Sequence, residues 1–364
     1  MFFPQDKKWL KARHGYYDKL RNASFLFFSK RHNGHVVTRY EDVLFILKNP
    51  NLFISGQGNL IEESPSRYNK TLGASDNPTH DDIKKYVVDS YSKKSIDRII
   101  SRFNQEFTLT SDVSASLDWM AAVVLDELIN APFDSLEDLY NILRHSPTNV
   151  IEKIEHTGFK NFTDNMNRSL NNNVKAFEDG IYKEYTTKKC PYPALLYGAT
   201  ASGIQSLAGS LHFLTIDVAN NPDQFNLVKE DPELLPAFVN ESLRFNTSTA
   251  RFSRTATEDV SLSQGLVEAG ERVLICLEAA NRDENKFVNP HSFDITRDLS
   301  GHLGFGHGVH ACIALAISRA ILTEYMKILL KRNESLKLKQ KEPDYVLTTS
   351  GNFNLISNLE LEDD

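Results

Sequence analysis

A glycine-rich stretch that ends in a cysteine, residues 301–312, constrains this chain more than any other feature. It reads GHLGFGHGVHAC, and an apolar helical pattern begins directly after Cys312. Glycine allows backbone conformations and close approaches of the main chain that side chains forbid. We therefore expect Cys312 to lie where a loop turns into a helix N-terminus, whose dipole and free N–H groups favour the thiolate.

Three kinds of site are compatible with this stretch alone. A backbone-held thiolate can face a flat, metal-containing group, and a buried cysteine can also be purely structural in a tight turn. A zinc site formed by His307, His310 and Cys312 is the third reading. Zinc sites usually bring a second pair of ligands, and Cys190 and Cys276 lie far away in the sequence without a nearby partner.

Composition bounds the class of protein. The chain has 364 residues, of which 41% are hydrophobic and 24% charged, as in ordinary soluble globular proteins. It has no run of about 18 apolar residues and no signal-peptide pattern, and its 3 cysteines lack a framework spacing. A net charge of −7 argues against a nucleic-acid partner. We expect a cytoplasmic protein without a membrane partner and, in the absence of any sign of oligomerisation, a monomer.

Residues 305–312 resemble the haem-binding loop of the cytochrome P450 superfamily, Phe-Gly-x-Gly-x-His-x-Cys. The resemblance implies a mainly α fold with a smaller β region, in which haem b lies between a long central helix and the helix after the cysteine. It also implies that Cys312 is the axial ligand of the iron, that Phe305 packs near its sulfur and that His310 contacts a haem propionate.

The remaining chain adds elements in a family-like order. We expect a single domain in which a β-rich part, about residues 30–75 and 247–300, packs on a helical body. The periodicities predict a helix and a basic turn over 5–33, a strand over 34–40, a helix over 41–48, a loop over 53–75, helices over 112–145 and 192–220, and a substrate lid at about 134–190. The conformation of the lid is not readable from its sequence.

Further cationic residues match positions that bind propionates in the family. His80 and Lys84 are four residues apart on one predicted helical face, and they match a histidine–arginine pair of the family. Lysine keeps the positive charge but loses the bidentate geometry of arginine. Arg254 matches a strand arginine with the same role. On their own, such residues would be expected on a solvated face.

The long predicted helix over 192–220 departs from the family at its catalytic step. Gly203 is costly inside a helix by about 1 kcal/mol relative to alanine, which suggests close packing against a flat ligand and the substrate. The family places an acid and a threonine two and three residues further on, where they relay protons to dioxygen. Here Gln205 and Ser206 stand at these positions. Glutamine cannot ionise, although an amide and a hydroxyl can still hold a water molecule.

Three residues are assigned to structure. Glu241 and Arg244 can pair along a helix, and the arginine lies 68 residues (312 − 244) before Cys312, where the family carries its Glu-x-x-Arg pair. Arg297 matches the arginine that completes this buried network. Loss of one member of such a network leaves a buried charge unpaired, at a cost of several kcal/mol.

Three residues before Arg254 are predicted to line the substrate pocket: Thr249, Ala250 and Arg251. An arginine is unusual at the last of these positions. It could form a salt bridge with an acidic substrate, but we expect it to point into solvent.

The resemblance implies an oxidoreductase, a monooxygenase that inserts oxygen from O2 into a small organic substrate. Electrons are expected from a separate ferredoxin- or flavodoxin-type partner, because 364 residues leave no room for a reductase domain. Lys84, Lys85, Lys93 and Lys94 could form its docking patch or simply a solvated face. Gln205 and Ser206 also suggest an alternative, a peroxide-driven or otherwise atypical haem-thiolate enzyme. A non-catalytic haem protein that binds or senses a small ligand is the remaining class.

Overall fold

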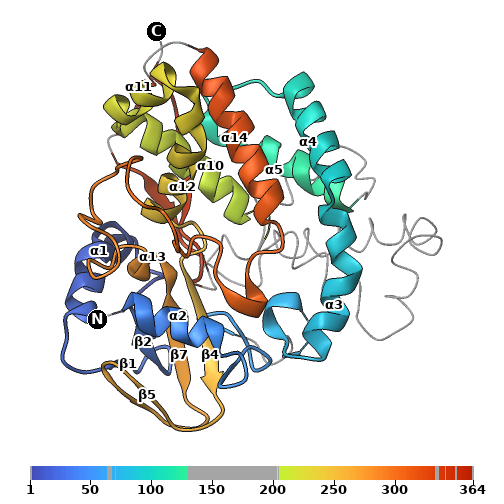
Figure 1. Cartoon of the computed structure of the whole chain (residues 1–364). Coiled ribbons are helices and arrows are strands. Elements are labelled where there is room, and N and C mark those ends of the chain that lie inside the picture. The colour runs from blue at the N-terminus through green and yellow to red at the C-terminus, as the bar shows by residue number, and fades with distance from the viewer. Residues whose placement is uncertain are drawn as a thin grey trace.

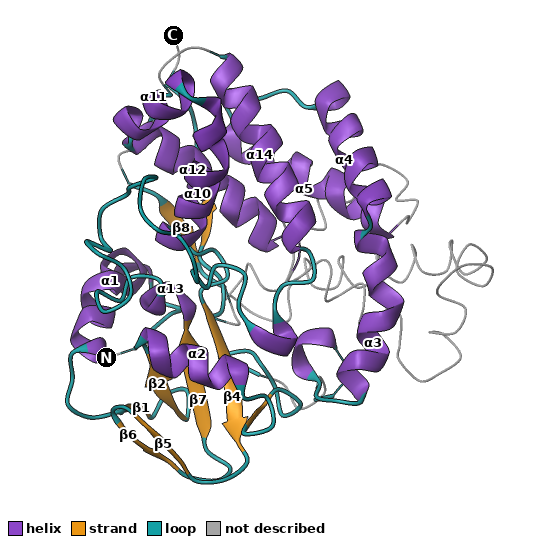
Figure 2. Cartoon of the chain, viewed as in Figure 1, coloured by secondary structure: helices purple, strands orange, loops and turns teal. Residues whose placement is uncertain are grey.

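The computed structural model describes residues 2–63, 68–69, 71–129, 203, 205–332, 336–340, 342–348 and 351–362. The predicted lid at 134–190 and most of the predicted helix before residue 205 lie outside the described residues. Helices dominate, and a smaller sheet region lies at one end of the molecule (Figures 1 and 2). None of the helices in the described part is long and apolar enough to cross a membrane.

The longer helices and the short helical turns follow in chain order. They are α1 (Lys7–Arg21), α2 (Tyr40–Lys48), η2 (Leu72–Ala74), α3 (Thr79–Val87), η3 (Val88–Tyr91), α4 (Lys93–Glu106), α5 (Val113–Ile129), α10 (Gln205–Asn220), α11 (Pro222–Glu230), η6 (Pro232–Leu234), α12 (Leu235–Phe245), α13 (Leu277–Ala280), η7 (Gly308–His310) and α14 (Leu315–Lys331).

Five strands form the main sheet in the order β1-β2-β7-β4-β3. β5 pairs with β6 and β8 pairs with β9 in two separate two-stranded sheets. The strands of all three sheets are β1 (Phe27–Ser29), β2 (Gly34–Val37), β3 (Phe53–Ile54), β4 (Arg251–Ala256), β5 (Val260–Leu262), β6 (Gly265–Val267), β7 (Arg272–Cys276), β8 (Asp344–Val346) and β9 (Leu355–Ser357). β2 runs parallel to β7, whereas β7 and β4 pair antiparallel. The sheet therefore joins the N-terminal segment to residues more than 200 positions later.

Apolar sequence explains the central elements. α10 buries residues around most of its circumference, including Leu207, Leu211, Leu214 and Val218, as expected for a helix surrounded by others. It packs against α5, α12 and α14 in the helical layer. β7, which reads Arg-Val-Leu-Ile-Cys, is buried over its last four residues, as expected for an interior strand.

The structure corrects the prediction for the first 33 residues. Asp6 caps α1 by accepting a hydrogen bond from the Trp9 N–H at 2.7 Å, and α1 ends at Arg21. Residues 27–29 then form strand β1, which pairs antiparallel with β2. The sequence reading of a helix followed by a basic turn missed this strand because its three residues are set by pairing with β2, not by a local pattern.

Candidate active site

The loop before α14 folds back on itself around its glycines. Gly306 and Gly308 have φ angles of 67° and 74°, in the left-handed region that favours glycine. A side chain at Gly308 would also come within 2.3 Å of the Leu47 carbonyl oxygen on α2. The Cys312 N–H donates a hydrogen bond to the Phe305 carbonyl at 2.9 Å, so the turn holds Phe305 and Cys312 at neighbouring positions.

The side chain of Cys312 is exposed, and it lies three residues before the first residue of α14. Desolvation by the surrounding protein raises the pKa of the thiol, and a hydrogen bond from the Ala314 backbone N–H acts in the opposite direction with a smaller effect. The Ala314 N–H just before α14 thus acts in the direction that the helix N-terminus argument expects, and desolvation of the thiol has the larger, opposite effect.

Four basic side chains that were predicted from separate segments converge beside this loop. The rings of His80 on α3 and His310 on η7 have centroids 4.6 Å apart. Burial first, and then the charges of Arg254, His80 and Lys84, lower the pKa of His310 to about 3. His80 is 2% exposed and Arg254 is 5% exposed. Because a pKa of about 3 leaves His310 neutral at pH 7, the positive charge in this cluster of His80, Lys84, Arg254 and His310 comes from Arg254 and Lys84.

Arg254 lacks a carboxylate partner within the described part of the chain. Among the described residues its guanidinium donates a hydrogen bond from Nη1 to the neighbouring Ser253 carbonyl at 2.7 Å. Burial lowers the pKa of Arg254 to about 10, and the charge of Asp76 offsets only part of this effect. A buried guanidinium without an ion pair is costly, and an anionic ligand would relieve that cost.

Ser55, in the 53–75 loop, and Asp76, directly after it, complete this cluster. No sequence motif indicated a role for Ser55. Ser55 Oγ lies 3.1 Å from His310 Nε2. The carboxylate of Asp76 accepts hydrogen bonds from the backbone N–H groups of Ser55 and Gly56 at 2.8 and 2.7 Å. Asp76 thereby fixes the backbone that carries Ser55. Composition could not single out Ser55, because the same loop contains three further serines, Ser64, Ser66 and Ser75.

Gln205 and Ser206 form the start of α10. Gln205 is 5% exposed, and within the described part of the chain neither polar atom of its side chain has a hydrogen-bond partner. The Ser206 hydroxyl donates to the Gly203 carbonyl at 2.9 Å. A side chain built at Gly203 would meet no atom of the described residues within 4 Å.

In the segment that follows α12, Arg251 differs from its predicted orientation. Thr249 forms an isolated β-bridge with Phe353, and Ala250 is fully buried. The predicted solvent-facing orientation of Arg251 is wrong, because its side chain is 0% exposed and Nη1 lies 2.9 Å from Glu278 Oε1. Its guanidinium also donates to Asn354, so Arg251 is engaged within the core and not available to a substrate.

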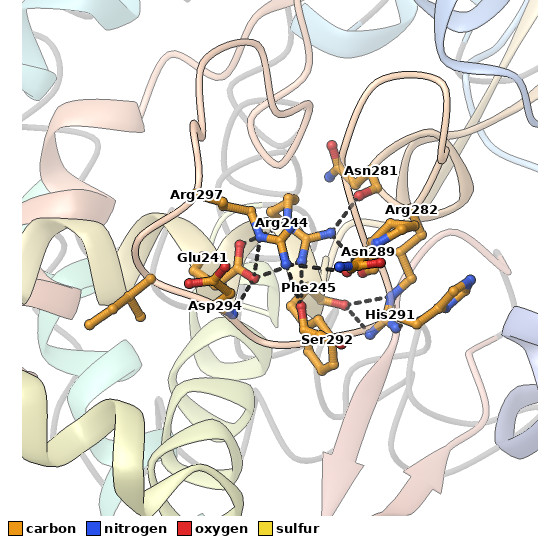
Figure 3. A network of polar contacts seen from close by, with 12 residues as sticks. Glu241, Arg244, Phe245, Asn281, Arg282, Asn289, His291, Ser292, Asp294 and Arg297 are labelled. Carbon is orange, nitrogen blue, oxygen red and sulfur yellow. Dashed lines mark hydrogen bonds and ion pairs between the residues drawn. The ribbon is translucent and has the colours of Figure 1, made fainter.

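The predicted structural triad is assembled in the structure (Figure 3). Arg244 makes two hydrogen bonds of 2.7 Å to the Glu241 carboxylate, and Arg297 Nε lies 3.1 Å from Glu241 Oε1. Arg244 also donates to the carbonyls of Asn281 and Pro290. The triad ties α12 to the segment before the cysteine loop.

The described residues do not support the zinc site considered for His307, His310 and Cys312. Among the residues that the structure describes, no group of three or more histidine, cysteine, aspartate or glutamate side chains is arranged to hold a metal ion. The ring of His310 belongs instead to the basic cluster with His80.

Comparison with known proteins places this geometry in a family. The sequence model of cytochrome P450 matches residues 229–360. The biotin biosynthesis cytochrome P450 of Bacillus subtilis (strain 168) is 28% identical over 93% of this chain and 93% of its own length. Nocardicin C N-oxygenase of Nocardia uniformis subsp. tsuyamanensis is 38% identical over 40% of this chain and 36% of its own length.

Solved structures share the fold. Cytochrome P450 CYP109Q5 from Chondromyces apiculatus superimposes with a TM-score of 0.83, over 99% of this chain and 97% of that chain, at 19% sequence identity. Members of the family bind haem through a cysteine thiolate. The chain belongs to the cytochrome P450 superfamily, and it is a haem-dependent oxidoreductase of the monooxygenase class.

Proposed function

We propose that Cys312 ligates the haem iron and that His80, Lys84, Arg254 and His310 bind the propionates. The observation that carries this assignment is Arg254, a buried guanidinium that has no carboxylate partner among the described residues and lies beside His310. Propionate carboxylates supply the charge that this cluster lacks, in charge-assisted hydrogen bonds. The donor set therefore fits haem b, and Phe305 would lie near the sulfur.

The proposed reaction is the insertion of one oxygen atom from O2 into a small organic substrate. Haem bound through a thiolate supplies the activation of dioxygen. The chain's own residues would orient the substrate near Gly203, Thr249 and Ala250, and they would hold protons at the hydroxyl of Ser206. The amide of Gln205 can donate and accept a hydrogen bond, but it cannot deliver a proton as a carboxylic acid does.

One observation favours a second candidate function, a peroxide-driven or otherwise atypical reaction. Gln205 is buried, and neither polar atom of its side chain has a partner among the described residues; it stands at the position where the family resemblance implies an acid. Hydrogen peroxide brings its own protons, so a peroxide-driven enzyme has less need of that acid. We expect Gln205→Glu to raise O2-dependent turnover relative to peroxide-driven turnover; equal ratios in both proteins would remove this candidate.

Electrons would reach the protein from a separate ferredoxin- or flavodoxin-type partner in the cytoplasm, with the enzyme acting as a monomer. Only some of the lysines on α3 and α4 are available to contact an acidic partner protein. Lys85 and Lys93 already pair with Asp82 at 3.0 Å and Asp97 at 2.8 Å, whereas Lys94 is exposed. Lys94 is thus the better candidate for an intermolecular contact, because Lys84 is assigned to the propionates.

Haem titration of the cysteine variants tests the assignment. Cys312→Ala should bind haem more weakly and without a thiolate ligand, whereas Cys276→Ala is the matched control, because Cys276 is buried at the end of β7. If Cys312→Ala and Cys276→Ala gave the same haem spectrum as the parent protein, the assignment of Cys312 would be wrong.

A further inference from the structure

Three serines meet where the first turn of α10 touches the segment after α12. The hydroxyls of Ser210 and Ser248 both lie 2.8 Å from the Ser206 carbonyl oxygen. They also lie 2.9 Å from each other. Each of the two hydroxyls has one proton to donate. At any moment these two protons can therefore satisfy only two of the three contacts, the two to the Ser206 carbonyl and the one between Ser210 and Ser248. The Ser206 carbonyl is thus held from its own helix by Ser210 and from another segment by Ser248.

Close approach of the two segments depends on Gly209. A Cβ atom at this position would lie 3.0 Å from Ser248 Cβ, 3.1 Å from Leu355 Cδ2 and 3.2 Å from the Asn354 carbonyl oxygen. These distances are shorter than ordinary van der Waals contact, and one of the neighbours is backbone. Glycine therefore allows α10 to come near enough for Ser248 to reach Ser206.

Ser248 is itself held by surrounding backbone and side chains. It is 4% exposed, and its carbonyl accepts a hydrogen bond from the Asn354 N–H at 2.7 Å. The Asn354 side chain donates to Glu278 at 2.6 Å, and Glu278 is in turn paired with Arg251. The buried Arg251–Glu278 pair thus anchors the segment that presents Ser248 to the helix.

We infer that Ser248 is a positioning residue for Ser206, an inference that rests on the proposed role of Ser206 in holding protons. A serine hydroxyl that bonds to a helical carbonyl one turn earlier competes with the backbone and bends the helix. Ser210 provides such a bond within α10, and Ser248 adds a second from outside. Together they set the direction of the first turn, and hence that of the Ser206 hydroxyl and the Gln205 amide.

The test uses the haem-loaded full chain and Ser248→Ala, with Ser242→Ala as the matched control. Ser242 also links α12 to α10 through a buried hydroxyl, 2.6 Å from Asp217 Oδ2, but it has no contact with Ser206 in the described part of the chain. The probe is carbon monoxide bound to the reduced protein, whose C–O stretching band reports the polar groups around the ligand. Reoxidation of the dithionite-reduced protein by air gives a rate for the same site.

Ser248→Ala should shift or split the C–O band and should speed reoxidation by about fivefold, the effect of losing one ordinary hydrogen bond. Gly209→Ala keeps the hydroxyl but pushes Ser248 away, so it should change the band in the same direction. Ser242→Ala should leave both readouts as in the parent.

An unshifted band and an unchanged reoxidation rate in both Ser248→Ala and Gly209→Ala would overturn the inference, as would equal changes in Ser242→Ala. Failure of the proposed function looks different, because the parent protein itself would then lack the carbon monoxide spectrum of a thiolate-ligated haem.

Discussion

The imidazole rings of His80 and His310 pack edge to face, with centroids 4.6 Å apart and ring planes at 74°. They come from α3 and η7, which are separated by more than 200 residues in the chain. Arg254 from β4 adds a third basic group to this contact. Two imidazoles beside a buried guanidinium form a set of hydrogen-bond donors that suits an anionic ligand, and the first prediction follows from it.

Arg254→Gln should release haem faster than the parent protein by about tenfold, because a charge-assisted hydrogen bond to a propionate is lost. Transfer of haem to an excess of apomyoglobin measures the rate. Arg39→Gln is the control, since Arg39 donates to the carbonyls of Arg21 and Ala23 and is not part of the basic cluster. Equal release rates in Arg254→Gln and the parent would contradict the propionate assignment.

Glu241→Gln should lower the free energy of unfolding by about 3–5 kcal/mol, because it leaves the buried guanidinium of Arg244 without its counter-charge. Urea unfolding followed by circular dichroism measures the change. Asp97→Asn, which removes an exposed pair with Lys93, should have no measurable effect. A loss from Glu241→Gln as small as that from Asp97→Asn would show that the triad is not structural.

The parts of the site that could be predicted from the sequence are those that depend on short local motifs. The spacing of His80 and Lys84 places both on one helical face, and the triplet spacing of Glu241 and Arg244 allows an ion pair within one helix. The glycines before Cys312 likewise predict a tight loop. Each of these signals depends on residues a few positions apart, which secondary structure alone brings together.

Contacts that depend on long-range pairing could not be predicted. Arg251 is opposite Cys276 in the β4–β7 register, and this register brings its guanidinium to Glu278, two residues beyond β7. The pKa of the Cys312 thiol depends on desolvation by surrounding segments, which a local helix-dipole argument omits. Strand β1 and the contact of Ser55 with His310 escaped prediction for the same reason.

Stability should depend on pH through Asp217 on α10. Burial raises the pKa of this carboxyl from 3.8 to about 8, although hydrogen bonds from Ser242 and Asn246 act in the opposite direction. The folded state therefore keeps a proton that the unfolded state releases. Stability should fall as pH rises through this window, by up to roughly 1.4 kcal/mol per pH unit.

Asp217→Asn should remove this contribution, so that the variant gains stability relative to the parent as the pH rises toward 8. Thermal unfolding of both proteins at several pH values measures the difference. Parallel pH profiles of the two proteins would show that the carboxyl does not titrate in this range.

Lys94→Glu should slow reduction by a plant-type ferredoxin about threefold at low ionic strength, and the difference should shrink at high salt because exposed charges are screened. Stopped-flow reduction under carbon monoxide gives the rate. Lys8→Glu is the control, since Lys8 lies on α1, on the opposite side of the molecule from α4 (Figure 1). If both variants slowed reduction equally, net charge and not a local patch would be responsible.

The most direct test of the central claim is the absorption spectrum of the reduced protein under carbon monoxide. We expect the parent protein to show the strongly red-shifted Soret band of a thiolate-ligated haem, and Cys312→Ala to lose it while Cys276→Ala retains it. A parent protein without this band, or a Cys312→Ala variant that keeps it, would contradict the account.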